Sequence, residues 1–197
     1  MRTVDPVRHA ARRTAIQGAA AQVFAEHGYT GATTAAICRA AGVGSGTLFH
    51  YFGDKRSIMI SVFADDFAAN DELIAGLDDS LGLDGVWILL DHLCQDAGDP
   101  LVPGLVGAML QLALVDEEFA GLLEAGDDRV RGAFARLLRR AQADGHVDAD
   151  LDPARAGRWL QGLVDTLFLM SGSDGFEPTA EVAELRRIAA SYLGSAS

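Results

Sequence analysis

Apolar residues recur every three or four positions along most of the chain, which is the spacing that gives a helix one apolar face. The first such segment runs from about Val7 to Glu26 and brings Ile16, Ala20 and Phe24 onto one side. No segment alternates β-branched and polar residues between hairpin turns, so the pattern carries no signal for a sheet. We therefore predict an all-α fold.

Glycine and the capping residues divide the first sixty positions into short helices. The His27-Gly28 pair ends the first helix in the manner of a C-terminal glycine, and Thr33 is an N-cap for a short helix through Ala41. The turn Gly42-Val43-Gly44 precedes another short helix from Ser45 to Phe52, and Asp54 caps a longer helix that starts near Lys55. Two short helices joined by a glycine-containing turn form a helix-turn-helix unit, whose second helix fits the major groove of DNA.

The remainder of the chain is also helical, with breaks predicted at Gly82, Asp99-Pro100, Gly145 and Asp152-Pro153. Two long segments, at about 117–144 and 153–171, are amphipathic and have more apolar surface than one packed face needs. We expect them to form a four-helix bundle between two copies of the chain. A final helix is expected from about Thr179 to Leu193.

Side chains of the helix-turn-helix segment separate into two groups by the direction expected for them. The inward group is apolar and consists of Ile37, Ala41, Val43, Leu48 and Phe52. The outward group is rich in donors and partly aromatic, which suits base edges and phosphates, and consists of Arg39, Ser45, Gly46, Thr47, Phe49, His50 and Tyr51.

Charge supports the same placement, although the net charge of −12 argues at first against a nucleic-acid partner. Residues 1–60 hold seven arginines and lysines against three acids, a net charge of +4. Residues 61–197 hold nine arginines against 25 acids, a net charge of −16. If this chain binds DNA, the first sixty residues therefore bind it.

Four runs in the first domain resemble the N-terminal domain of TetR-family repressors in order, spacing and residue type. They are Ile16–Ala20 with Phe24–Tyr29, Ile37–Val43, Gly46–Phe52, and Lys55. The resemblance implies an N-terminal three-helix helix-turn-helix DNA-binding domain over 1–53 plus a C-terminal helical ligand-binding and dimerisation domain over 54–197. It also implies a homodimeric repressor on a near-palindromic DNA operator, released by a small apolar or amphipathic effector.

The same resemblance suggests roles for individual residues. Thr47 and His50 would read bases, Tyr51 and Lys55 would hold phosphates, and Arg39 would contact a phosphate from the preceding helix. The chain departs from the family's usual residues at three positions, with Gly44 in place of serine, Cys38 in place of alanine and Phe49 in place of tyrosine. Phe49 lacks the hydroxyl that would bond a phosphate, and the nearby cluster of Arg8, Arg12 and Arg13 would compensate if it faces DNA.

The second domain contains candidates for the lining of an effector cavity, although packing in the core is the simpler explanation for each residue taken singly. These candidates are Phe67, Trp87, Leu90, Asp91, Cys94, Met109, Leu112, Trp159, Leu163, Asp165 and Met170. Asp91 and Asp165 lie among apolar neighbours and would meet a cation or a donor on a ligand, or else lie at the edge of a solvated face. Asp91, His92 and Cys94 diverge around a helix, so no metal site is expected.

Other classes of protein have less support. No nucleophile elbow, phosphate loop or His-Glu-x-x-His motif is present, so we expect neither an enzyme nor a cofactor. No apolar run approaches the ~20 residues of a membrane span, and the polar start lacks the pattern of a signal peptide, so we expect a cytoplasmic protein without a membrane partner. Two alternatives remain: a helical DNA-binding activator or architectural protein with no small-molecule ligand, and a helical carrier or enzyme with an incidental hairpin.

Overall fold

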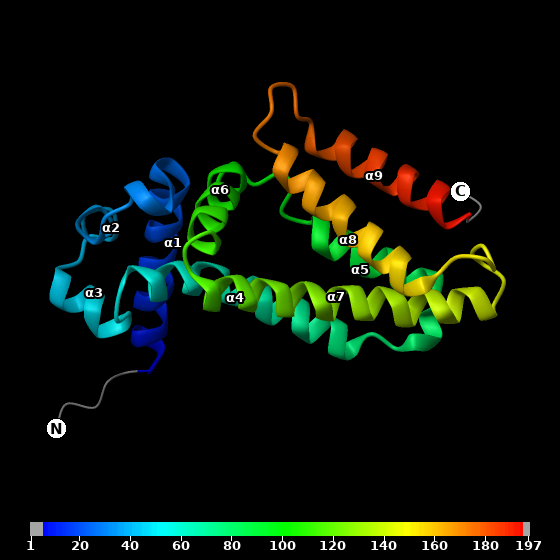
Figure 1. The fold of residues 1–197 in the computed structure, drawn as a ribbon. Helices are drawn as coiled ribbons and strands as arrows, with labels where there is room; N and C mark the ends of the chain where they lie inside the picture. The colour runs from blue at the N-terminus through cyan, green and yellow to red at the C-terminus, as the bar shows by residue number, and fades with distance from the viewer. Residues whose placement is uncertain (1–5, 195–197) are drawn as a thin grey trace. The chain divides into compact units, whose positions relative to one another are not determined.

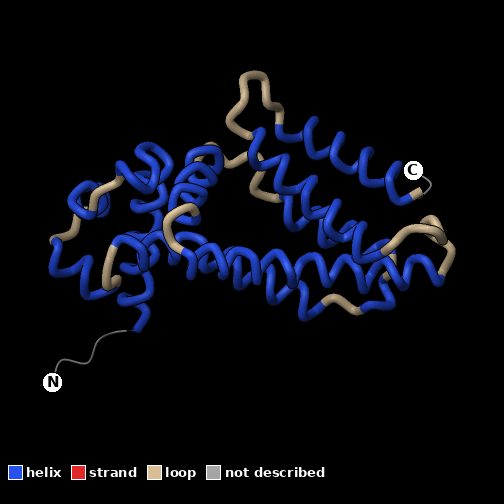
Figure 2. The backbone as a smooth tube through the Cα atoms, viewed as in Figure 1, coloured by secondary structure: helices blue, strands red, loops and turns tan. Residues whose placement is uncertain are grey.

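The computed structural model describes residues 6–194, and all regular structure within that range is helical (Figures 1 and 2). The predicted all-α fold is confirmed. In chain order the helices are α1 (Pro6–Gly31), α2 (Thr34–Ala41), α3 (Ser45–Tyr51), α4 (Lys55–Gly76), the 3₁₀ turn η1 (Asp79–Leu81), α5 (Leu83–Cys94), α6 (Val102–Ala113), α7 (Glu117–Ala143), α8 (Pro153–Met170) and α9 (Pro178–Leu193).

The helices form two compact units, and these do not follow the expected boundary between residues 53 and 54. The N-terminal unit joins the described residues up to 65 with 104–120, and the C-terminal unit joins 66–103 with those from 121 onward. Residues 104–120 belong to the first unit because the Oε1 of Gln111 accepts a hydrogen bond from the backbone N–H of Thr30 at 3.0 Å, and Gly104 lies directly against the carbonyl of Ala25. A DNA-binding part confined to 1–53 stays a prediction.

The predicted signals at the ends of the first helices are confirmed. The backbone of α1 leaves the helical conformation at Gly28, where φ is +66°, and makes one more turn to Gly31. The hydroxyl of Thr33 accepts from the N–H of Ala36 at 3.1 Å, and α2 ends on Gly42 in the left-handed region at φ +61°. Asp54 accepts from the N–H of Ser57 at 2.6 Å and so caps the start of α4. Local capping chemistry thus decides where α2 and α4 begin.

The C-terminal unit is built around one apolar core that α5, α7, α8 and α9 share (Figure 1). Its large, fully buried members include Leu89, Leu90, Phe134 and Leu137. The breaks predicted in this part also appear: Gly82 and Gly145 have positive φ, and α5 and α6 are separate helices on either side of the Asp99-Pro100 step. Asp152 caps α8 by accepting from the N–H of Ala154 at 3.0 Å, with Pro153 at the first helical position.

Among residues 6–194, no helix has both the length and the apolar character that crossing a membrane requires.

Candidate nucleic-acid interface

The helix-turn-helix is held by three apolar side chains that point inward as predicted. Ile37 on α2 and Leu48 on α3 are completely buried, and Phe52, which ends α3, is 4% exposed. The other two residues predicted to face inward, Ala41 and Val43, are half-buried. The turn between the helices is closed by the N–H of Val43, which donates to the carbonyl of Cys38 at 3.0 Å. Burial on one side therefore fixes which side of α3 meets solvent.

The opposite side of α3 is open. Ser45, Gly46, Thr47, Phe49 and His50 are exposed, and Phe49 keeps 47% of its surface accessible. Tyr51 is half-buried, and Arg39 is exposed on α2. The structure thus brings the predicted outward residues onto one solvent-facing region around a short helix. Gly44 occupies the N-cap of α3 without a side-chain hydrogen bond, as expected for glycine in place of serine.

An aromatic cluster, which the sequence analysis missed, joins the start of α1 to the end of α3. The His9 ring lies 4.5 Å from the Tyr51 ring and 6.1 Å from the His50 ring, measured between centroids. The rings of His50 and Tyr51 are 5.5 Å apart, edge to face. One turn further along α1, the guanidinium of Arg13 lies 5.2 Å from the centre of the Phe52 ring.

Lys55 is engaged within the N-terminal unit. Its Nζ donates to the carbonyl of Tyr29 at 2.7 Å and to that of Ala32 at 3.1 Å, and lies 4.4 Å from the centre of the Tyr29 ring. Two of the three ammonium donors are therefore used to join the start of α4 to the end of α1. Phosphate binding by Lys55 stays a prediction, to which the structure adds this second role.

A second basic residue at the start of α4 is committed to an ion pair. Both Nε and Nη2 of Arg56 donate to the carboxylate of Asp116, in the segment between α6 and α7, and Nη2 also pairs with Glu118 at 3.0 Å. Asp116 in addition accepts from the N–H of Phe119 at 2.8 Å. The hydrogen bond from Arg56 holds the pKa of the Asp116 carboxyl below its usual value. This two-point contact joins α4 to the α6–α7 segment.

The predicted effector-lining residues are divided between the two units, and their role in binding an effector stays a prediction. Met109 and Leu112 belong to the N-terminal unit, and the remaining nine lie in the C-terminal unit. Leu90 and Cys94 are core residues, so the alternative of core packing describes them. Trp159, Asp165 and Met170 are exposed on α8, and Asp91 is exposed on α5. Phe67, Trp87 and Leu163 are half-buried.

The two acidic candidates already have partners within the C-terminal unit. Arg186 on α9 pairs with Asp91, and its guanidinium lies 5.0 Å from the centre of the Trp87 ring. On α8, the Nε2 of Gln161 donates to Asp165 at 2.9 Å. Partial desolvation raises the pKa of Asp165 on α8 and that of Asp127 on α7.

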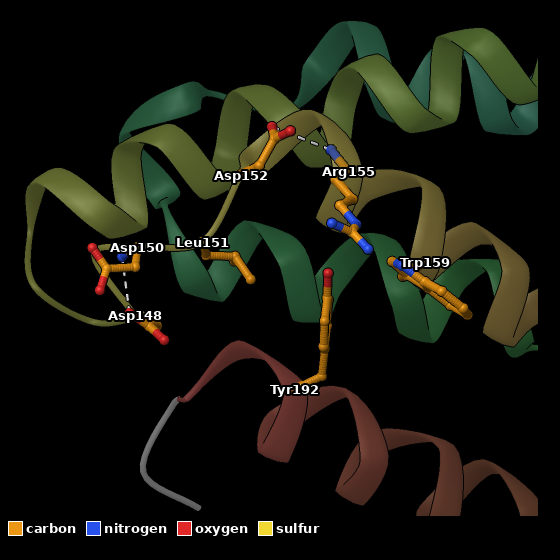
Figure 3. A pocket seen from close by; sticks show the side chains of 7 residues that line it. All are labelled: Asp148, Asp150, Leu151, Asp152, Arg155, Trp159 and Tyr192. Carbon is orange, nitrogen blue, oxygen red and sulfur yellow. Dashed lines mark hydrogen bonds between the residues drawn. The ribbon is translucent and has the colours of Figure 1, made fainter.

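A pocket of about 620 Å³ that is open to solvent lies at another place in the C-terminal unit (Figure 3). Tyr192 points from α9 toward Arg155 on α8, and Trp159 lies beside them (Figure 3). Three aspartates and Leu151 complete the lining: Asp148, Asp150 and Asp152. Only Trp159 belongs to the predicted lining. Two of these three carboxylates already accept hydrogen bonds from nearby backbone. Asp148 accepts from the N–H of Asp150 at 2.9 Å, and Asp152 caps α8.

Comparison with known proteins assigns the chain to a family. Residues 16–62 match the model of bacterial regulatory proteins of the TetR family, and residues 88–196 match the model of the C-terminal part of BetI-type transcriptional repressors. The transcriptional repressor KstR2 of Rhodococcus jostii is 31% identical over 155 residues, which cover 76% of this chain and 74% of that protein. The chain belongs to the TetR family.

Other known proteins resemble the chain over most of its length. The transcriptional regulator UidR of Escherichia coli is 24% identical over 153 residues, covering 77% of this chain and 76% of that protein. A TetR regulator from Haloarcula marismortui has the same fold, with a TM-score of 0.78 at 19% identity over 94% of this chain and 97% of that one. The fatty acid degradation regulator FadR from Bacillus halodurans gives 0.76 at 24% identity, with the same coverage.

Membership of the TetR family establishes the general function. This TetR-family chain is a DNA-binding transcriptional regulator and not an enzyme. Its resemblance extends beyond the helix-turn-helix, because the match over residues 88–196 includes α6 to α9 and most of α5.

Proposed function

We propose that this TetR-family regulator is a repressor that binds a near-palindromic operator as a homodimer and is released by a small apolar or amphipathic effector. One observation carries the proposal: the exposed side of α3 holds short donors and aromatic rings, while Ile37, Leu48 and Phe52 anchor its opposite side. A recognition helix needs this combination, because an anchored backbone lets side chains meet base edges in a constant register.

We assign base reading to Thr47 and His50, and contacts with the DNA backbone to Arg39 and Tyr51. In helix-turn-helix proteins the N-terminal residues of the second helix contact base edges, and Ser45, Gly46 and Thr47 form the exposed first turn of α3. Gly46 has no heavy atom within 4 Å of the position that a Cβ would occupy, so the backbone there is open to a DNA strand.

A dimer is needed because a near-palindromic operator presents two half-sites to two symmetric copies. The expected interface combined the segments 117–144 and 153–171. The second half of α7 now has a different role, since Phe134, Leu137 and Leu138 are fully buried in the protomer's own core. On α8, by contrast, Trp159 and Leu169 are 57% and 61% exposed.

We therefore keep α8 in the proposed interface and add α9, which packs along it (Figure 1). On α9, Ile188 and Tyr192 are 40% and 37% exposed, so both helices present partly exposed apolar side chains. Exposed apolar side chains gathered on two adjacent helices are typical of a surface that a second copy covers.

The proposed effector site lies in the C-terminal unit near Trp87 and Leu163. Both side chains are only partly buried and pack against the main core, from α5 and α8 respectively. A ligand that binds better to a form with wrongly spaced recognition helices releases DNA through that difference in affinity alone. The related FadR structure is described as a regulator of fatty acid degradation, which makes fatty acids a suitable first panel of apolar and amphipathic probes.

The DNA part of the proposal is tested by selecting duplexes from a random pool and titrating the selected duplex at several salt concentrations. We expect a near-palindromic sequence and a steep loss of affinity with salt. His50→Ala should lower affinity and relax preference at one base position, by about 1–3 kcal/mol. His146→Ala, an exposed histidine of the C-terminal unit, is the control and should change neither. Selection of a sequence without two-fold symmetry would contradict operator binding by a dimer.

The interface is tested by sedimentation of two matched variants that each place a charge on an exposed leucine. Leu169→Asp on α8 should yield a monomer with weakened operator binding. Leu114→Asp, in the N-terminal unit, is the control because Leu114 is 85% exposed and lies outside the proposed interface. A dimer that persists in Leu169→Asp would contradict the assignment to α8 and α9.

The effector part is tested by adding saturated fatty acids of graded chain length to the operator complex. Release of the operator by fatty acids of some chain lengths and not others would support an effector site. A weaker response to the same fatty acids in Leu163→Trp would place that site near α5 and α8. Unchanged operator affinity with every length would favour the alternative of a DNA-binding activator or architectural protein without a small-molecule ligand.

A further inference from the structure

The start of α1 contacts the end of α3 at two successive turns. His9 lies beside the Tyr51 ring at 4.5 Å between centroids, and Arg13, four residues later, lies over the Phe52 ring at 5.2 Å. Residues four apart share one side of a helix, so a single side of α1 supports the last two aromatic residues of the helix-turn-helix. His50 completes the group, since its ring meets that of Tyr51 edge to face at 5.5 Å.

Recognition helix α3 depends on such support. It has only seven residues, lacks a side-chain hydrogen bond at its N-cap and has no acidic residue in its first turn. Helices this short are not stable on their own in water. Leu48 anchors α3 from the buried side, whereas His50 is exposed and Tyr51 is half-buried. Among the described residues, the ring contacts that reach His50 and Tyr51 from another helix come from His9.

The cluster also contains side chains whose charge depends on pH. Histidine is the side chain that changes charge between about pH 5 and 8. Here the His9 and His50 rings are 6.1 Å apart. The packed elements carry further charged or titratable groups: Arg8, Arg12 and Arg13 on α1, Arg39 on α2, Tyr51 on α3, and Asp54 and Lys55 at the start of α4.

Cations outnumber anions among the charged groups on these elements, and this sets the local balance of charge. The carboxylate of Asp54 accepts from the N–H of Ser57, and the ammonium of Lys55 donates to the carbonyls of Tyr29 and Ala32. A DNA phosphate placed against this region reverses the balance, since it attracts each added proton. By linkage, a proton that strengthens DNA binding is itself bound more tightly in the DNA complex.

We propose that His9 is a positioning residue of the DNA-reading surface, which holds Tyr51 and His50 at the end of α3 and takes up a proton when the protein binds DNA. The proposal rests on the established DNA binding of the family and on this stack of rings, and is independent of the effector and of the dimer interface.

The test uses the full chain and measures its affinity for the selected operator and for a random-sequence duplex between pH 5.5 and 8.5 at constant ionic strength. The wild-type affinity should rise about tenfold or more on going from pH 8.5 to 5.5 for both duplexes. The random duplex keeps the pH test valid if no operator is found.

Two substitutions separate the two roles of His9. His9→Phe keeps a ring against Tyr51 but cannot be protonated, so its affinity at pH 8.5 should stay within about twofold of the wild type while its pH dependence becomes shallower. His9→Ala removes the stack and should lose about tenfold at pH 8.5, with relaxed preference at the bases under the end of α3. His27→Ala, on the same helix and 53% exposed at its side chain, is the control and should change neither property.

Each outcome decides one part of the proposal. A pH dependence in His9→Phe equal to that of the wild type would overturn proton uptake by His9. Unchanged affinity and base preference in His9→Ala would overturn its positioning role. Circular dichroism and thermal unfolding of each variant show that the comparison is made between folded proteins, and His9→Phe keeps the test informative if His9→Ala does not fold.

Discussion

Gly157 lies at a close approach of α8 to α7, and replacing it with alanine should destabilise the protein although alanine is the better helix former. A Cβ at this position would lie 2.7 Å from the carbonyl oxygen of Arg131 and 3.3 Å from the Cβ of Phe134. The first of these contacts is with backbone, which cannot rotate away, so α8 must move outward. Forced overpacking of this kind costs about 1–3 kcal/mol. The propensity of alanine returns about 1 kcal/mol, which leaves a net loss of up to about 2 kcal/mol.

The matched control is Gly132→Ala, in the interior of α7, where a Cβ would meet no heavy atom within 4 Å. Propensity alone acts there, so we expect a gain of up to about 1 kcal/mol, or ~2–4 °C in Tm. Denaturant unfolding at one fixed protein concentration measures both variants and keeps any effect of association constant. Equal stabilisation by the two substitutions would refute the close approach of α8 and α7.

Two further predictions concern titratable groups of the C-terminal unit. Partial desolvation raises the pKa of Asp165, so the folded protein binds this proton more tightly than the unfolded chain, and stability falls as pH rises from about 4 through the raised pKa. Asp165→Asn should therefore stabilise the protein at pH 7, by less than about 1 kcal/mol because solvent screens the exposed side chain. The gain, measured by thermal unfolding, should vanish near pH 3.5. A larger gain at low pH than at pH 7 would contradict this sign. Burial also raises the pKa of the Cys94 thiol to about 11. Iodoacetamide at pH 8 should therefore modify half-buried Cys38 in the native protein and Cys94 only after unfolding, which peptide mass spectrometry measures. Modification of Cys94 in the native protein at the rate of Cys38 would contradict its burial.

Contacts between distant parts of the chain explain why some functional assignments needed the structure. Lys55 reads as a phosphate ligand from its position after the helix-turn-helix, yet its ammonium meets the carbonyls of Tyr29 and Ala32, which lie more than twenty residues earlier. Likewise, no local pattern shows that His9 stacks on Tyr51. Such pairs depend on how helices pack, and a single sequence contains no periodic signal for them.

The helices themselves were determined by the sequence alone, because their signals act between neighbouring residues. The hydroxyl of Thr33, the left-handed conformation of Gly42 and the carboxylate of Asp152 act within three residues of the helix ends they define. The exposed set on α3 also followed from the helical period once Ile37 and Leu48 were taken as buried.

Tertiary structure alone decided how the apolar surface is shared. The amphipathic pattern of α7 is as suitable for an interface between protomers as for an internal core, and packing against α5 and α8 assigns Phe134 and Leu137 to the core. The same packing leaves Trp159 and Leu169 exposed on α8, and places 104–120 in the N-terminal unit through Gln111 and Asp116. Hydrophobic burial is not directional, so the sequence specifies which side chains are stabilised by burial, but only the packed chain determines which residues bury them.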